Sequence, residues 1–205
     1  MKIRSAIALS LVPFALSACN SQVSGPQAQD LPNATHPIEV TLQVDTTQPE
    51  PNLLRVRGET TLPNDFVMQI GVCRMLVKLD EASSETFSYG TCGSSTYYEI
   101  QRVEVDDQQF AATFNVPTVQ ETRKIQMNYV DRNPDDKARE LVPWEFVKIE
   151  VDGFPSQQPD HILQMIGGPQ GINLTGSRVR EHRSYTSDSQ KNSYNQVTWE
   201  QNLKL

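Results

Sequence analysis

The densest group of oxygen-bearing side chains in the sequence could bind a calcium ion. Asp131, Asn133 and Asp135 alternate along the chain, and Asp136 follows directly. Carboxylate and amide oxygens are the ligands that calcium prefers, and alternate side chains of a loop can wrap around one ion. The EF-hand loop also requires glycine at its sixth position and glutamate at its twelfth, where this chain has Asp136 and Val142. A solvated turn is therefore the favoured interpretation, and calcium binding through Asp131, Asn133 and Asp135 is kept as an alternative.

The three histidines lack the neighbours that catalysis requires. His36, His161 and His182 have no partner at the spacing of a metal site or a catalytic triad. The sequence also has no serine nucleophile elbow, no phosphate-cradling glycine loop and no His-Glu-x-x-His motif. It therefore predicts no catalytic residue, no cofactor and no enzymatic activity.

The first 18 residues have the layout of a cleavable export signal. Lys2 and Arg4 supply a short positive region, and an almost wholly apolar run follows from Ala6 to Leu16. This run is too short to cross a membrane, which takes about 20 residues. We therefore expect residues 1–18 to be removed during export and the mature chain to lack a spanning segment.

The end of this signal, Leu16-Ser17-Ala18-Cys19, resembles the lipobox of bacterial lipoproteins. The resemblance implies that the Cys19 thiol receives a diacylglyceryl group, that cleavage occurs before Cys19, and that the new amino group is acylated. Two or three acyl chains hold a protein on a membrane, whereas a single chain binds only marginally. The expected location is the cell envelope, outside the cytoplasm. Because Asn20 is not aspartate, the outer membrane is favoured if the host has two membranes.

The two other cysteines are expected to pair, given that resemblance. Lipid on Cys19 leaves Cys73 and Cys92 as an even pair in an oxidising compartment, so a disulfide is the leading interpretation. Two free thiols are the alternative. A shared metal is disfavoured because no histidine or carboxylate stands at ligand spacing around them.

Composition limits the classes of partner. Removal of residues 1–18, with Lys2 and Arg4, leaves 187 residues and moves the formal net charge from −7 to −9. This acidic balance argues against nucleic acid and against a face that lies flat on anionic lipid. Residues 19–37 are polar and rich in proline, glutamine and serine, which predicts a disordered tether with a span of roughly 23 Å.

Residues 38–205 are expected to form one all-β domain. No stretch has a convincing helical period, and the 13 prolines favour short elements with many turns. Alternation of apolar and polar residues predicts seven to nine short strands. We place them at residues 38–44, 53–61, 66–79, 96–105, 109–116, 123–130, 144–151, 161–166 and 197–205.

Three details of this pattern carry further predictions. The apolar phase slips at Val72 and Cys73, which predicts a β-bulge or a break there. The turn at residues 106–108 predicts a hairpin between its flanking strands. Residues 176–195 are polar and predict a long exposed loop, although Arg178, Arg180 and Arg183 could instead form a basic strip for an anionic polymer.

The strand pattern is best interpreted as an antiparallel β-sandwich of immunoglobulin-like type. Residues 57–64 (RGETTLPN), 105–110 (VDDQQF) and 171–176 (GINLTG) are similar to turns in the small sandwich domains of bacterial surface lipoproteins. Gln108 stands where such turns often have glycine, which loosens the match. The resemblance implies a fold and brings no catalytic residue with it.

A non-enzymatic binding module on a lipid anchor is the function these features favour. Its expected partners are membrane lipid, through the acylated N-terminus, and another envelope protein or polymer, with no nucleic acid. Sandwich edges and loops bind by strand addition or loop contacts, without catalytic groups. The alternatives are a calcium- or carbohydrate-binding module, helped by an exposed Trp144, and an envelope enzyme or enzyme inhibitor.

Overall fold

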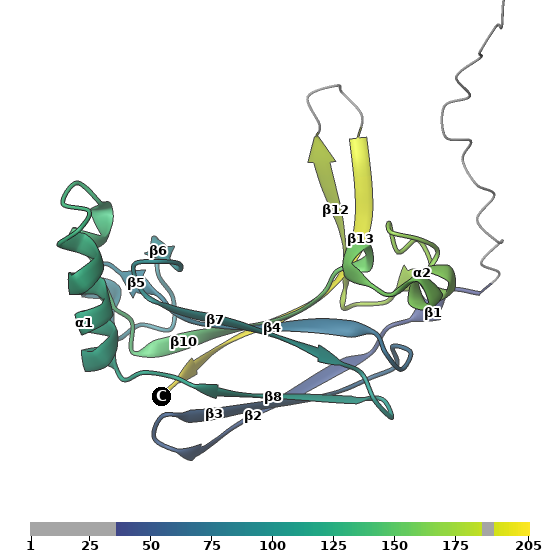
Figure 1. Ribbon diagram of the computed structural model, residues 1–205, viewed down its shortest axis with the longest axis horizontal. Coiled ribbons are helices and arrows are strands. Elements are labelled where there is room, and N and C mark those ends of the chain that lie inside the picture. Colours follow the sequence, from purple (N-terminus) through teal and green to yellow (C-terminus); the bar gives the residue numbers. More distant parts are fainter. Residues whose placement is uncertain (1–35, 186–190) are drawn as a thin grey trace, which may run out of the picture. The chain divides into compact units, whose positions relative to one another are not determined.

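The described chain forms a sandwich of two antiparallel sheets. The computed structural model describes residues 36–185 and 191–205, so the predicted signal, Cys19 and most of the tether lie outside the described residues. A five-stranded sheet, in the order β12-β13-β10-β4-β7, packs face to face with a three-stranded sheet, in the order β2-β3-β8 (Figure 1). The strands of these sheets are β2 Leu42–Glu50, β3 Leu53–Thr60, β4 Val67–Arg74, β7 Tyr97–Glu104, β8 Gln109–Asn115, β10 Phe146–Gly153, β12 Val179–Tyr185 and β13 Lys191–Lys204. These eight longer strands agree with the predicted number.

Smaller elements close the ends of the sandwich. β1 (Ile38–Glu39) pairs in parallel with β11 (Leu174–Thr175), and β5 (Leu76–Val77) lies between β6 (Gly90–Thr91) and β9 (Val142–Pro143). Helix α1 (Val119–Val130) lies beside β5 at one end of the five-stranded sheet, and α2 (Asp160–Ile166) lies near β1 and the base of β12 at the other (Figure 1). Among the described residues, no helix has both the length and the apolar character needed to span a membrane.

The core lies between the two sheets because alternate side chains of both point inward. Strand β3 contributes Leu54 and Val56, and β8 contributes Phe114, all without solvent exposure. From the opposite sheet, Ile70 and Ile149 are equally buried. At the cross-strand pair Gly58 and Phe110, the phenylalanine ring occupies the space where a Cβ of residue 58 would stand. The glycine therefore allows this ring to enter the core.

The strand predicted at residues 123–130 is wrong, because these residues belong to an α-helix. Helix α1 spans Val119–Val130 and begins with a capping box. The backbone N–H of Glu121 donates to the Thr118 hydroxyl (3.2 Å), and the N–H of Thr118 donates to the Glu121 carboxylate (2.8 Å). This pair satisfies two of the otherwise unbonded donors at the helix start.

The strand predicted at residues 161–166 is also wrong. Helix α2 spans Asp160–Ile166 and buries Ile162 and Ile166, which are one helical turn apart. It ends at Gly167, whose φ of 80° is the left-handed conformation that commonly terminates helices. The predicted end at residue 166 was right, and the predicted type of element was not.

The phase slip at Val72 and Cys73 has a different cause from the one predicted. Strand β4 pairs with β7 in one unbroken register from Val67 to Arg74, so no bulge occurs at the slip. Val72 points into the main core, whereas Cys73 belongs to a second buried cluster with Trp144 and Phe146. Both faces of the strand are covered at this end, and both residues are therefore apolar.

The hairpin predicted around residues 106–108 is present only as one antiparallel bridge, between Asp106 and Gln109, and its flanking strands do not pair with each other. A tight turn is present, with the N–H of Gln109 donating to the carbonyl of Asp106 (2.9 Å). However, β7 pairs with β4 and β8 pairs with β3, so the turn carries the chain from one sheet to the other. The long loop predicted at residues 176–195 is wrong as well, since β12 and the first part of β13 form a hairpin there.

Candidate functional site

The outward face of the five-stranded sheet combines exposed apolar side chains with charged ones. We call it the outer face and define it by the side chains that point away from the three-stranded sheet. Its centre carries two large apolar side chains, Tyr98 and Ile100, which are 45% and 47% exposed. The ring of Tyr98 leans over Gly71 on the neighbouring strand, where no side chain stands in its way. The other members of the outer face are Gln69, Arg102, Lys148, Glu150, Asp152, Gln196, Thr198, Glu200 and Asn202.

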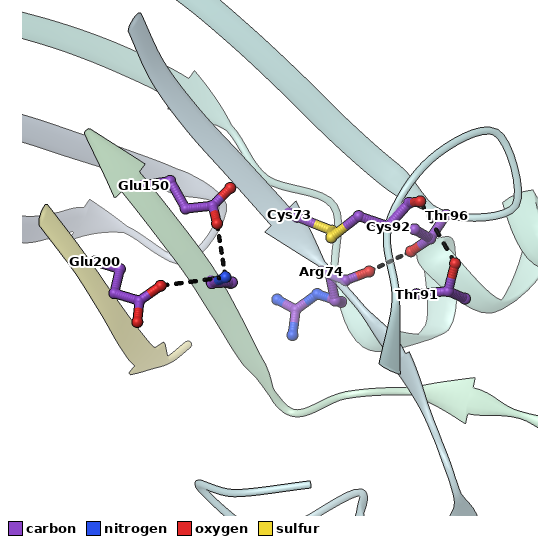
Figure 2. The surroundings of a disulfide bond; sticks show 8 residues. Cys73, Arg74, Thr91, Cys92, Thr96, Glu150 and Glu200 are labelled. Carbon is purple, nitrogen blue, oxygen red and sulfur yellow. Dashed lines mark hydrogen bonds and ion pairs between the residues drawn. A yellow bond between two sulfur atoms is a disulfide. The ribbon is translucent and has the colours of Figure 1, made fainter. Parts of the chain in front are cut away.

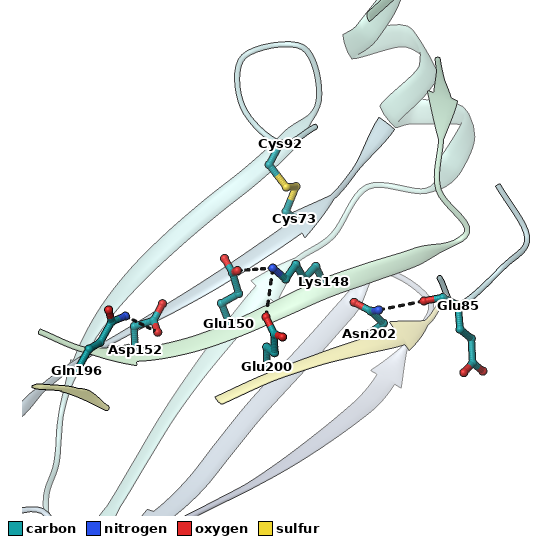
Figure 3. A network of polar contacts seen from close by, with 9 residues as sticks. All are labelled: Cys73, Glu85, Cys92, Lys148, Glu150, Asp152, Gln196, Glu200 and Asn202. Atoms are coloured by element: carbon teal, nitrogen blue, oxygen red, sulfur yellow. Dashed lines mark hydrogen bonds and ion pairs between the residues drawn. A yellow bond between two sulfur atoms is a disulfide. The ribbon is translucent and has the colours of Figure 1, made fainter. Parts of the chain in front are cut away.

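A lysine flanked by two carboxylates forms the ionic centre of the outer face. The Lys148 ammonium lies 2.6 Å from Glu150 and 3.3 Å from Glu200 (Figure 3). Glu150 and Glu200 are direct cross-strand partners, and like charges in this position repel unless a cation lies between them. Burial opposes the charge on Lys148, but the bonds to both carboxylates prevail and raise its pKa. Lys148 is therefore a fixed cation and unsuited to act as a nucleophile.

Asp152 introduces uncompensated negative charge beside Tyr98. Its carboxylate accepts a hydrogen bond from the side-chain amide of Gln196 at 2.8 Å (Figure 3). Burial raises the pKa of Asp152, and repulsion by Glu150 adds to this, against the hydrogen bonds from Thr198 and Gln196. Burial, together with the charges of Glu150 and Asp152, also raises the pKa of the Tyr98 phenol. This part of the outer face therefore has a negative potential that suits cationic or hydrogen-bond-donating ligands.

Asp152→Asn is expected to stabilise the fold at neutral pH. A carboxyl group with a raised pKa in the folded state favours folding only while it is protonated, and that stability is lost as pH rises through the folded pKa. The amide removes this loss and can still accept the bond from Gln196. Urea unfolding should thus show the variant above wild type at pH 7 and equal to it below pH 4. A wild type that is more stable at pH 7 would contradict the assigned charge state.

A disulfide-bonded loop borders one side of the outer face. Cys73 on β4 and Cys92 are joined, with Cα atoms 6.1 Å apart (Figure 2), which confirms the predicted disulfide. The loop between them lays Phe87 edge-on against Trp144, at 4.9 Å between ring centroids. A pocket of about 320 Å³ lies between Phe87 and the strands, lined also by Lys148, Glu200, Gln201 and Asn202. The disulfide thus holds one wall of this pocket.

Arg74, a buried arginine, holds the end of the five-stranded sheet that lies next to the disulfide-bonded loop. Arg74 is 2% exposed, and its guanidinium donates to three backbone carbonyls, those of Pro117 (3.1 Å), Trp144 (2.9 Å) and Glu145 (3.1 Å). Burial lowers its pKa to about 10, which leaves it charged at neutral pH. Because these carbonyls belong to the segment before α1 and to the two residues before β10, Arg74 fixes both segments against the end of β4.

A cavity of about 790 Å³ lies on the other sheet. It is an open polar hollow lined by Arg57 and by the carboxylates of Asp45, Glu59, Glu104 and Asp106. The lining contains neither histidine nor cysteine, and the only large apolar group is the ring of Phe110, which is 4% exposed. This hollow therefore offers charge without the apolar contact that the outer face provides.

Two of the four candidate calcium ligands, Asn133 and Asp136, are hydrogen-bonded within their own turn, and Asp131 and Asp135 are exposed beside them. The Asn133 side-chain amide donates to the carbonyl of Tyr129 (2.9 Å). Asp136 accepts from the backbone N–H of Ala138 (2.8 Å) and from the Tyr129 hydroxyl (3.0 Å). Within residues 36–185 and 191–205, no three histidine, cysteine, aspartate or glutamate side chains gather in a way that would hold a metal ion.

The remaining candidates are distributed over separate elements. His161 on α2 lies 3.3 Å from the exposed Asp65 carboxylate, and His182 on β12 stacks on Tyr194 at 5.4 Å between ring centroids. His36 precedes β1. Trp144, whose exposure would have favoured carbohydrate binding, is fully buried and donates its ring N–H to the carbonyl of Ser84 (2.6 Å).

The outer face itself was missed in the sequence. Its residues come from four strands whose order cannot be deduced from spacing. Lys148 and Glu200, for example, are 52 positions apart. The available signal was the outward side of the 96–105 and 144–151 patterns, which holds tyrosine, isoleucine, lysine and glutamate at alternate positions. Comparison with known proteins adds no further assignment, since no protein-family model, curated protein or solved structure matches this chain.

Proposed function

We propose that the protein is a lipid-anchored lipoprotein of the cell envelope whose sandwich is a non-enzymatic binding module. The partner is another envelope protein or polymer, and the binding surface is the outer face. The carrying observation is the exposed pair Tyr98 and Ile100 in the middle of a polar sheet face, beside a pre-ordered row of charges. Exposed aromatic and aliphatic side chains surrounded by polar groups are typical of interaction sites.

The finer fold type belongs to the same proposal. We assign the sandwich to the immunoglobulin-like type, with β2-β3-β8 as strands A-B-E and β13-β10-β4-β7 as strands G-F-C-C′. The sheet order supports this correspondence, as does the chain's repeated crossing between the sheets. Such sandwiches recur in surface proteins with unrelated functions, so the binding role is argued from the outer face alone.

Lipid anchoring through Cys19 predicts where the protein is found. Cys19→Ser removes the thiol that would carry the diacylglyceryl group, and two or more acyl chains supply the membrane attachment. We expect the variant to move from the membrane fraction to the soluble fraction and to lose metabolic labelling by a palmitate analogue. Asn20→Ala is the matched control and should leave both properties unchanged. Membrane retention of Cys19→Ser would refute the anchor.

Binding through the outer face is tested with the unlipidated chain. The mature chain with Cys19→Ser is mixed with envelopes from its own cells, and the amount that sediments with them is measured against concentration. Tyr98→Ala combined with Ile100→Thr should weaken this association at least about tenfold, as expected for loss of central apolar contacts. The double variant Gln43→Ala/Gln109→Ala, on the outside of the three-stranded sheet, should bind like the parent. Equal binding of all three chains would exclude the outer face.

A further inference from the structure

The C-terminal half of β13 is a sheet edge that the neighbouring strand β12 does not cover. Strand β12 pairs with residues 191–197 of β13 and stops there, whereas β13 continues along β10 as far as Lys204 (Figure 1). In the described part of the chain, no strand pairs with residues 199–204 on the side away from β10. The sheet is thus one strand narrower at this end. An additional strand could pair with residues 199–204 in the position that continues the line of β12.

The backbone of this edge presents its hydrogen-bonding groups outward. The N–H of Thr198 points away from β10, because it donates to the carbonyl of Arg178 at 2.9 Å. Backbone groups alternate in direction along a strand, so the N–H groups of Glu200, Asn202 and Lys204 point the same way. Unpaired edge groups of this kind are a template for another strand.

The side chains of residues 199–204 favour an added strand that has apolar residues on one face. Trp199 and Leu203 point toward the core and pack against it, yet both are only partly buried. Between them, Gln201 on the same side is exposed. An additional strand would cover this row, with its own alternate side chains lying beside those of Trp199 and Leu203.

The opposite side of the edge carries a pocket and an available carboxylate. The pocket of about 320 Å³ next to Phe87 opens at Glu200, Gln201 and Asn202. The Glu200 side chain is 55% exposed, and its only ion-pair partner among the described residues is Lys148, which lies closer to Glu150. A lysine or arginine on the added strand could therefore pair with Glu200.

We propose that residues 199–204 of β13 bind an extended peptide by strand addition, and that this peptide alternates apolar residues with a basic residue that faces Glu200. The proposal goes beyond the proposed binding role, because it adds a second site at the sheet edge with its own class of partner. Main-chain pairing supplies the affinity in such complexes, and the alternate side chains supply the selectivity. The apolar residues contact Trp199 and Leu203, and the opposite side chains lie next to the Phe87 pocket.

The probe is a fluorescein-labelled peptide of about eight residues in which valine alternates with lysine and threonine. Its binding to the mature Cys19→Ser chain is measured by fluorescence anisotropy. Asn202→Pro removes one outward N–H and leaves the pairing with β10 in place, and proline is tolerated on edge strands. Asn202→Ala is the matched control, because it removes only the side-chain bond to the Glu85 carbonyl (3.1 Å). Asn202→Pro should weaken binding at least about tenfold and Asn202→Ala should not.

A second measurement needs no protein variant. The same peptide with N-methyl groups on the N–H groups that face the edge should lose binding, whereas methylation of the other set should not. Absent binding of the unmodified peptide to the wild-type chain, or equal binding after both methylations, would overturn the proposal. A dimer of the free chain that Asn202→Pro abolishes would assign the edge to a second copy instead. Envelope association that depends on Tyr98 would persist in each of these cases, so the two proposals fail separately.

Discussion

Replacing Cys73 and Cys92 together with alanine is expected to lower the free energy of unfolding by about 3 kcal/mol. The disulfide joins residues 19 positions apart in the sequence and restricts the unfolded chain. It also holds the loop that lays Phe87 on Trp144, so the loop itself should open before the sandwich does. Urea unfolding measures the total loss, and hydrogen exchange of residues 79–95 measures the local opening.

The control for this prediction is Ser94→Ala, a change in the same loop that leaves the disulfide intact. Ser94 is exposed, and its removal should alter stability by less than about 0.5 kcal/mol. If the double alanine variant unfolded at the same urea concentration as wild type, the disulfide would have no role in stability. If residues 79–95 kept their protection, the loop would be held by packing alone.

Arg74→Met is expected to destabilise the fold by about 3 kcal/mol. The substitution keeps much of the side-chain volume but removes every donor from the carbonyls of Pro117, Trp144 and Glu145. Buried carbonyls without a donor are costly, and this cost exceeds the gain from no longer burying a cation. Chemical denaturation at neutral pH provides the measurement.

Arg102→Met makes the same chemical change on the exposed outer face and should cost less than about 0.5 kcal/mol. Arg74→Lys keeps the charge but cannot reach three carbonyls at once, and it should retain only part of the stability. Equal losses for Arg74→Met and Arg102→Met would show that the buried hydrogen bonds contribute nothing net.

Helix α1 was predicted as a strand because its buried positions do not form an apolar pattern. Its buried positions are Thr122, Gln126 and Val130, two of which are polar, whereas Ile125 and Met127 are 37% and 41% exposed. The amide of Gln126 is satisfied by the carbonyls of Ala138 and Leu141. A helix that buries hydrogen-bonded polar groups has no apolar stripe, and its exposed apolar residues alternated like those of a strand. The capping box at Thr118 and Glu121 was the remaining local signal.

Seven of the nine predicted strands were found because the cause of their pattern is local, whereas strand pairing was not predicted. The alternation of Leu54 and Val56, or of Ile149 and Val151, reflects one buried face and can be read along the chain. The turn at residues 106–108 looks like that of a hairpin, but the sheet joined by each strand depends on distant residues. The outer face depends on the same distant pairings, so its charges could not be brought together from spacing.

The outer face as a contact surface in the living cell is tested most directly by photo-cross-linking. The photoreactive residue benzoylphenylalanine is placed at Tyr98, or at Ala111 on the outside of the three-stranded sheet, in the otherwise native lipoprotein. Irradiation of intact cells should give a discrete adduct from position 98 and none from position 111. No adduct from position 98, or equal adducts from both positions, would contradict binding through the outer face, provided that both variants reach wild-type levels.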